Sequence, residues 1–118
     1  MALKISTHEA GSVTVVSCNG RIVFGEEAAD LREVVKSLLE RNQQIVIDLG
    51  GVNYIDSGGL GTLVGLYTSA RNAGGEIKLA NLTQRVRDQL QITKLITVFD
   101  CYPSEQAAVS AFPHRATA

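Results

Sequence analysis

The sequence predicts an α/β fold, in which helices pack on a single small mixed β-sheet in the order ββαβαβαβα. Runs of β-branched residues alternate with segments whose apolar residues recur at helical spacing, and this alternation requires a mostly parallel sheet. Two strand-like runs open the chain with no helix between them, which adds one antiparallel pair. The length of 118 residues predicts one domain over residues 1–118, with an ordered core at about 3–112.

The two opening strands and the first helix follow from their residue patterns. Residues 2–11, ALKISTHEAG, have alternating and β-branched character, and residues 12–23, SVTVVSCNGRIV, are rich in Val and Thr. The break at Gly11 predicts a hairpin between them. A helix is expected over residues 26–41, where acidic residues in the first turn suit the helix dipole. Its apolar face is Ala28, Leu31, Val35, Leu38 and Leu39.

The middle of the chain has the pattern of a buried strand followed by a helix. Residues 44–50, QIVIDLG, form a short continuous apolar run, which is typical of a strand buried on both faces. From about Ser57 the spacing becomes helical, and the expected apolar face is Leu60, Leu63, Val64 and Tyr67. This helix should end at residues 72–75, NAGG, where a glycine can adopt the left-handed cap conformation.

The last part of the chain continues the alternation of strands and helices. The expected elements are a strand at 76–82 (EIKLANL), a helix at 84–92 capped by Thr83, a short strand at 95–100 (LITVFD) and a helix that begins after Ser104 in PSEQAAVSAF. The tail at 113–118 is expected to fray.

Composition excludes several classes of function. The net charge of −1 provides no basic field for a nucleic acid or an anionic membrane. Aromatic residues make up 5 % of the chain and Trp is absent, so base-stacking surfaces are not expected. No apolar run reaches the ~18 residues of a membrane span, and the opening MALKISTHEA does not resemble a signal peptide. We therefore expect a cytoplasmic protein with no membrane partner.

The two cysteines give no sign of a metal or a cofactor. Cys18 and Cys101 are far apart and match no metal-ligand spacing, so neither a metal site nor a bound cofactor is expected. Cys18 lies within an apolar, strand-like run, which favours a small buried core residue over a redox role.

The stretch YIDSGGLGTL, residues 54–63, places an acid, a hydroxyl and three glycines where a helix should begin. One interpretation is a nucleotide cradle, because Gly59, Gly61 and Gly65 form a GxGxxxG pattern. The dinucleotide fingerprint needs its first glycine at the end of a strand and an acid about 20 residues further on. The expected strand ends well before these glycines, and residues 79–81 include no acid. A phosphate-binding P-loop would need a Lys after the glycines, and none follows.

A catalytic serine is the second interpretation of this stretch. Ser57 would need a base within hydrogen-bond reach and a third group to orient that base. The only histidines are His8, at the end of the first strand, and His114, in the tail, and nothing in the sequence directs either of them to Ser57. Asp56 cannot be aimed at its own neighbour from the same turn. We therefore expect no enzymatic activity and no catalytic residue.

The remaining features of the stretch concern capping and packing. Asp56 or Ser57 can cap the helix, with Gly58 and Gly59 as turn residues, and for Asp56 a cap is favoured over a role in steering the hydroxyl. Small residues also recur at helical spacing beside the apolar face: Gly58, Gly61, Thr62, Gly65 and Ser69. A glycine inside a helix costs about 1 kcal/mol relative to Ala. This small-residue stripe therefore serves close contact, either with the protein's own fold or with a partner.

The segment IVIDLGGVNYIDSGGLGTL resembles the signature of STAS domains, and specifically of the stand-alone bacterial anti-sigma factor antagonists. The resemblance extends from about Leu3 to Phe112 and implies a mixed sheet with helices. It also implies a protein switch. Members of this family bind an anti-sigma factor that is a serine kinase with a histidine-kinase-like ATPase fold, and so free a sigma factor for transcription. The kinase phosphorylates the serine directly after the Asp, here Ser57, and a PP2C-type phosphatase reverses the modification.

The resemblance also implies a partner-binding surface, and the sequence departs from the family pattern in two places. The residues expected to bind the partner are Asp56, Ser57, Gly58, Gly61, Thr62 and Gly65. The second motif residue, often Ser in the family, is Gly58, and the loop after the second strand, often acidic, has Arg21-Ile22-Val23 in those places. The identity of the partner therefore stays open, as does an alternative function: a stressosome-like or signalling scaffold that does not act as a phospho-switch.

Overall fold

The computed structural model describes residues 3–113 and contains a five-stranded sheet with the order β1-β2-β3-β4-β5. Its strands are β1 (Leu3–Ala10), β2 (Val13–Ile22), β3 (Gln44–Ile55), β4 (Glu76–Ala80) and β5 (Cys101–Tyr102). β1 and β2 are antiparallel, and the other neighbouring strands are parallel. Gly11 has a φ of 65° at the hairpin turn, where glycine is favoured. The predicted mixed sheet is confirmed.

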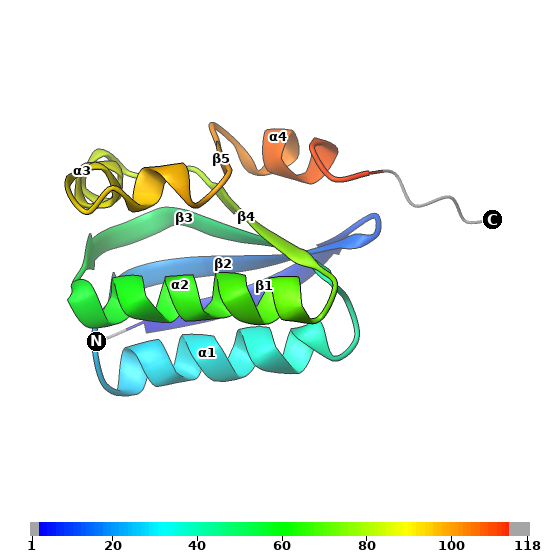
Figure 1. Cartoon of the computed structure of the whole chain (residues 1–118), viewed down its shortest axis with the longest axis horizontal. Helices are drawn as coiled ribbons and strands as arrows, with labels where there is room; N and C mark the ends of the chain where they lie inside the picture. Colours follow the sequence, from blue (N-terminus) through cyan, green and yellow to red (C-terminus); the bar gives the residue numbers. More distant parts are fainter. Residues whose placement is uncertain (1–2, 114–118) are drawn as a thin grey trace.

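The helices form a layer on each face of the sheet. They are α1 (Glu26–Leu39), α2 (Ser57–Asn72), α3 (Gln84–Ile92) and α4 (Glu105–Ser110). α1 and α2 lie side by side, run in the same direction and cover one face (Figure 1). The main core lies between this face and the two helices α1 and α2, and it includes Leu31 and Leu63. Leu90 joins this core from α3. A smaller cluster on the opposite face joins Val15 and Val46 to α4.

Local capping signals in the sequence are confirmed. The Thr83 hydroxyl accepts a hydrogen bond from the Val86 amide at the start of α3, and the Ser104 hydroxyl accepts one from Ala107 at the start of α4. Gly74 follows α2 with a φ of 84°, the left-handed conformation expected at the end of that helix. Caps of this kind depend on neighbouring residues alone, which explains why the sequence predicts them well.

The predicted strand over residues 95–100 is wrong. Leu95–Thr97 forms a short 3-10 helix, and β5 contains only two residues, which pair with Leu79 and Ala80. A short apolar run does not distinguish a strand from a buried helical turn, because both bury apolar side chains. β4 ends at Ala80 rather than at residue 82, and it begins only at Glu76. In the parallel register that pairs Leu79 with Cys101, Leu95–Thr97 would lie beside residues 73–75, which precede β4. The apolar side chains of 95–99 pack on the main core from a turn instead.

β3 is longer than the predicted strand and runs five residues further, from residue 50 to Ile55. Its first half pairs with β4, but beyond Asp48 that edge is covered by α3. The Thr83 hydroxyl donates to the Val52 carbonyl at 3.0 Å, and the Gln89 amide donates to the Ile55 carbonyl at 3.2 Å. The extension carries the chain to the edge of the sheet where β2 also ends, since Ile55 pairs with Ile22. Asp56 and Ser57 therefore follow the strand directly.

Three further observations bear on the excluded functions. Cys18 is buried, and burial, with the nearby Asp48 charge, raises the pKa of its thiol to about 12, as suits a core residue. Within residues 3–113, no three His, Cys, Asp or Glu side chains are grouped to hold a metal ion. Over the same residues, no helix has the length and apolar character needed to cross a membrane. His114 and most of the tail predicted to fray lie outside the described residues.

Candidate functional site

Asp56 joins the start of α2 to the loop between β2 and α1. It is the N-cap of α2, and its Oδ1 accepts a hydrogen bond of 2.8 Å from the Gly59 amide. Both carboxylate oxygens also accept the Phe24 amide at 3.1 Å, and the Asp56 amide donates to the Ile22 carbonyl. The interpretation of Asp56 as a cap is confirmed. The carboxylate is turned toward this loop and anchors it to the helix.

Removal of this carboxylate should loosen the start of α2. We expect Asp56→Ala to lower the free energy of unfolding by about 1–2 kcal/mol, because an N-cap bond and two contacts to the Phe24 amide are lost. Asp56→Asn should cost less, since its amide oxygen still accepts the Gly59 amide. Urea unfolding followed by circular dichroism measures both. Asp30→Ala, on the exposed face of α1, is the control, and an equal loss in that variant would contradict the capping role.

Ser57 is exposed at the first position of α2. Its hydroxyl makes no hydrogen bond to another residue within 3–113, whereas the neighbouring Asp56 carboxylate accepts hydrogen bonds from the Phe24 and Gly59 amides. The first amides of a helix lack partners within the helix, and the helix dipole makes this end positive. The geometry therefore presents a free hydroxyl to solvent at a position that tolerates an added negative charge.

The glycines of the motif divide into two groups that the sequence does not distinguish. The prediction that Gly58 and Gly59 are turn residues is wrong. Both lie in the first turn of α2 and pack against the rest of the fold. A Cβ on Gly58 would lie 2.5 Å from the Phe24 Cβ, and one on Gly59 would overlap the Ile22 carbonyl oxygen. A Cβ on Gly61 or Gly65 would meet nothing within 4 Å. The small-residue stripe thus serves internal packing at its start and faces open space further along.

The structure gathers most of the predicted partner-binding residues in one place. A shallow groove between α1 and α2 is lined on the α2 side by Gly58, Gly61, Thr62, Gly65 and Ser69. Thr62 uses its hydroxyl internally, as a donor to the Gly58 carbonyl at 3.0 Å. Two predicted site residues do not line the groove: Asp56 faces the neighbouring loop, and Ser57 is exposed at the start of α2. The stripe that the sequence indicates is therefore one wall of this groove.

The loop after β2 differs from its prediction. Arg21 and Ile22 belong to β2, and Ile22 is fully buried, so only Val23 of the three departing residues follows the strand. The residue that the sequence analysis missed is Phe24, whose side chain is 82 % exposed and leans on Gly58. A single large apolar residue between a strand and the glycine before a helix was the available signal.

Large apolar side chains are exposed at a few positions, and one of them contacts the start of α2. Within residues 3–113 there are three of them: Phe24, Tyr54 and Ile92. Phe24 packs on Gly58, and Tyr54 stands two residues before Asp56. Ile92, at the end of α3, lines one surface pocket together with Tyr54. Phe24 is therefore the apolar side chain that lies beside the Ser57 end of α2.

The geometry bears on both alternative interpretations of the motif. His8 contacts Glu105 of α4 at 3.0 Å and is not part of the Ser57 site. The spacing argument against a nucleotide cradle is wrong in one respect, because β3 runs up to Asp56 and no long gap separates it from the glycines. The absence of an acid at residues 79–81 still argues against a nucleotide cradle. In addition, the glycines lie inside α2, and Asp56 places a carboxylate at the position where a pyrophosphate would bind.

Comparison with known proteins agrees with this fold and motif. Residues 4–108 match the family model of the STAS domain. An anti-sigma-B factor antagonist of Bacillus subtilis (strain 168) is 35 % identical over 79 residues, 67 % of this chain and 72 % of that protein. An anti-sigma F factor antagonist of Paenibacillus polymyxa is 26 % identical over 113 residues, 93 % of this chain and 95 % of that protein.

A solved structure of an anti-sigma factor antagonist has the same fold. The anti-sigma factor antagonist from Mycobacterium paratuberculosis superimposes with a TM-score of 0.80 at 24 % identity, over 93 % of each chain. The chain therefore belongs to the STAS domain family, and within it to the anti-sigma factor antagonists. Proteins of this class are regulatory binding proteins.

Proposed function

We propose that this protein is a phosphorylatable switch that binds an anti-sigma factor serine kinase while Ser57 is unphosphorylated, and so regulates sigma-factor-dependent transcription. The observation that carries the proposal is the exposed Ser57 at the first position of α2, next to Gly58 and the exposed Phe24 that packs on it. The kinase would have the histidine-kinase-like ATPase fold, and a PP2C-type phosphatase would reset the switch. All three proteins would act in the cytoplasm.

Phosphorylation at Ser57 is compatible with an intact fold. A phosphate adds about −1.5 to −2 charges, and the start of a helix stabilises such a charge. Asp56 keeps its cap bond to Gly59, because that bond uses the carboxylate and not the serine hydroxyl. The added group would therefore change the surface and leave the packing of α2 on the sheet as it is.

The same phosphate would oppose binding of the partner. In the complex, the exposed side chain of Phe24 would be covered, and water would leave the region around Ser57. A doubly charged group in such an interface loses its hydration, which is costly unless the partner supplies opposite charge. The unphosphorylated protein would bind and the phosphorylated protein would be released.

The protein itself would be a substrate and not an enzyme. Within residues 3–113, Ser57 has no histidine near it, since His8 lies against α4, and its adjacent carboxylate already accepts two backbone amides. A serine nucleophile without a base has little reactivity at neutral pH. Kinase and phosphatase activity would therefore come from the partners alone.

Labelling with a cognate kinase tests the modification site. We expect incubation with the anti-sigma factor kinase of the same organism and ATP to add one phosphate per chain, located on Ser57 by peptide mass spectrometry. Ser57→Ala should take up none. Thr62→Val is the matched control and should be labelled like the wild type, because the Thr62 hydroxyl is already bonded within the helix. Equal labelling of Ser57→Ala would place the modification elsewhere and contradict the proposal.

A further inference from the structure

The groove between α1 and α2 has walls of different chemistry. The α2 wall is the small-residue stripe, where Gly61 and Gly65 leave the backbone uncovered. The α1 wall is formed by Arg32 and Lys36, and Phe24 closes the end next to Gly58. A partner segment that lies in this groove would reach the α2 backbone closely on one side and two cations on the other.

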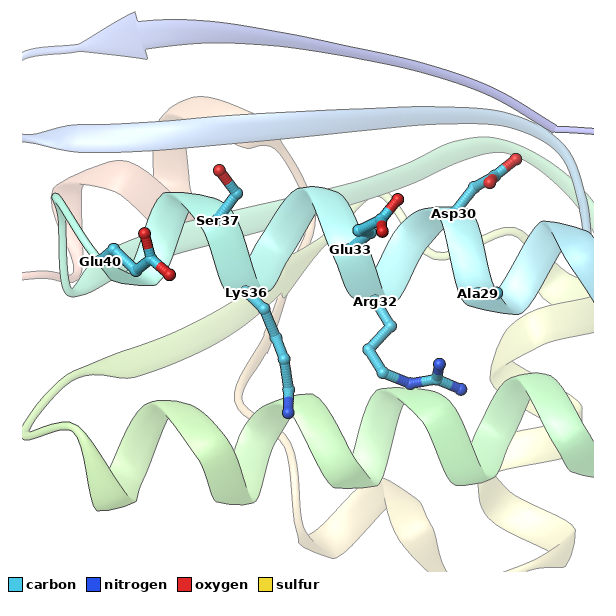
Figure 2. Close-up of a pocket in the computed structure, with 7 residues that line it drawn as sticks. All are labelled: Ala29, Asp30, Arg32, Glu33, Lys36, Ser37 and Glu40. Atoms are coloured by element: carbon cyan, nitrogen blue, oxygen red, sulfur yellow. The ribbon is translucent and has the colours of Figure 1, made fainter.

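Both cations are directed over the groove, and neither has an ion-pair partner in the described part of the chain. Figure 2 shows Arg32 and Lys36 reaching from α1 toward α2, whereas Asp30, Glu33 and Ser37 point away from it. Within residues 3–113, the ion pairs of the structure involve His8 and Lys78 and neither of the groove cations. The side chains of α2 add no carboxylate, because Arg71 is its only charged residue. The groove is therefore positive although the chain as a whole has a net charge of −1.

We propose that this groove binds an acidic amphipathic segment of the protein partner, with its carboxylates at Arg32 and Lys36 and its apolar side chains against Phe24. The inference rests on the proposed function and adds the chemistry of the partner to it. Two unpaired cations beside an uncovered backbone match a narrow anionic segment in charge and in shape. A broad anionic surface, such as a membrane or a nucleic acid, would also meet Asp30 and Glu33 on the other side of α1.

The test uses two synthetic peptides titrated into the whole isotope-labelled protein and followed by NMR. Each peptide is about 15 residues long, so that a helix can form, and carries leucines at i, i+3, i+4 and i+7. One has glutamate and the other has lysine at the remaining positions. We expect the glutamate peptide to shift the Gly61 and Gly65 amide resonances and to bind about tenfold more tightly than the lysine peptide at low salt. The difference should shrink as the salt concentration rises.

Charge reversal assigns the effect to the groove. Arg32→Glu with Lys36→Glu should abolish the preference for the glutamate peptide. Lys4→Glu with Arg41→Glu changes the net charge equally at exposed positions outside the groove and should keep the preference. Equal binding of both peptides, absent binding of the glutamate peptide, or shifts confined to Tyr54 and Ile92 would each overturn the inference. None of these results depends on phosphorylation, so the groove and the switch can fail separately.

Discussion

Ser57→Asp is expected to weaken binding to the anti-sigma factor kinase by at least about 100-fold, which corresponds to about 3 kcal/mol. The fixed carboxylate would stand near the exposed Phe24, and the partner would have to remove its hydration water on binding. The melting temperature should change little. An acid at the first position of α2 interacts favourably with the helix dipole, and Ser57 makes no contact whose loss would matter.

Two variants separate the position of the charge from its mere presence. Ser57→Ala should bind like the wild type, because it adds no charge. Ser37→Asp places the same acid on α1, on the side that points away from α2, and should also leave affinity unchanged. Isothermal titration calorimetry with the purified kinase measures all three. If Ser57→Asp and the phosphorylated protein both bind as tightly as the wild type, the switch is wrong and the scaffold function gains support.

Gly59→Ala is expected to lower the free energy of unfolding by about 3 kcal/mol or more, the upper range for added volume in a packed site. The new methyl group would overlap the Ile22 carbonyl oxygen and stand 2.9 Å from Ile55 Cγ1, and both neighbours belong to the sheet. Gly61→Ala should instead raise the free energy of unfolding by up to about 1 kcal/mol. Its methyl group meets nothing within 4 Å, so only the better helix propensity of Ala counts.

Denaturant unfolding of both variants decides between internal packing and an open surface. The two glycines are two residues apart in one helix, so each variant is the control for the other. Destabilisation by Gly61→Ala equal to that by Gly59→Ala would show that the whole stripe is packed internally. Gly61→Leu extends the test to binding: the protein should fold, and bulk in the groove should reduce affinity for the kinase.

The sequence by itself determined the features that depend on contacts between neighbouring residues and on the periodicity of apolar residues. The alternation of strands and helices predicted the mixed sheet, and Thr83 and Ser104 cap the helices that follow them. Asp56 and Ser57 indicate the start of a helix, because an acid or a hydroxyl at the N-cap position accepts an amide from the first turn, and in the structure Asp56 does so. The motif around them also indicated the family, since its order of residue types is specific.

Only the tertiary structure decided what each residue of the motif touches. Gly58 and Gly59 face the end of β2 and its loop, whereas Gly61 and Gly65, on the same helix, face open space. Phe24 reaches the site from a different part of the chain, and its backbone amide donates a hydrogen bond to the Asp56 carboxylate. Residue type and spacing show which side chains share a helix face, but contact depends on segments far apart in sequence. The run over 95–100 follows the same reason: β4 begins only at Glu76, so in the parallel register the first half of this run has no strand beside it and forms a turn.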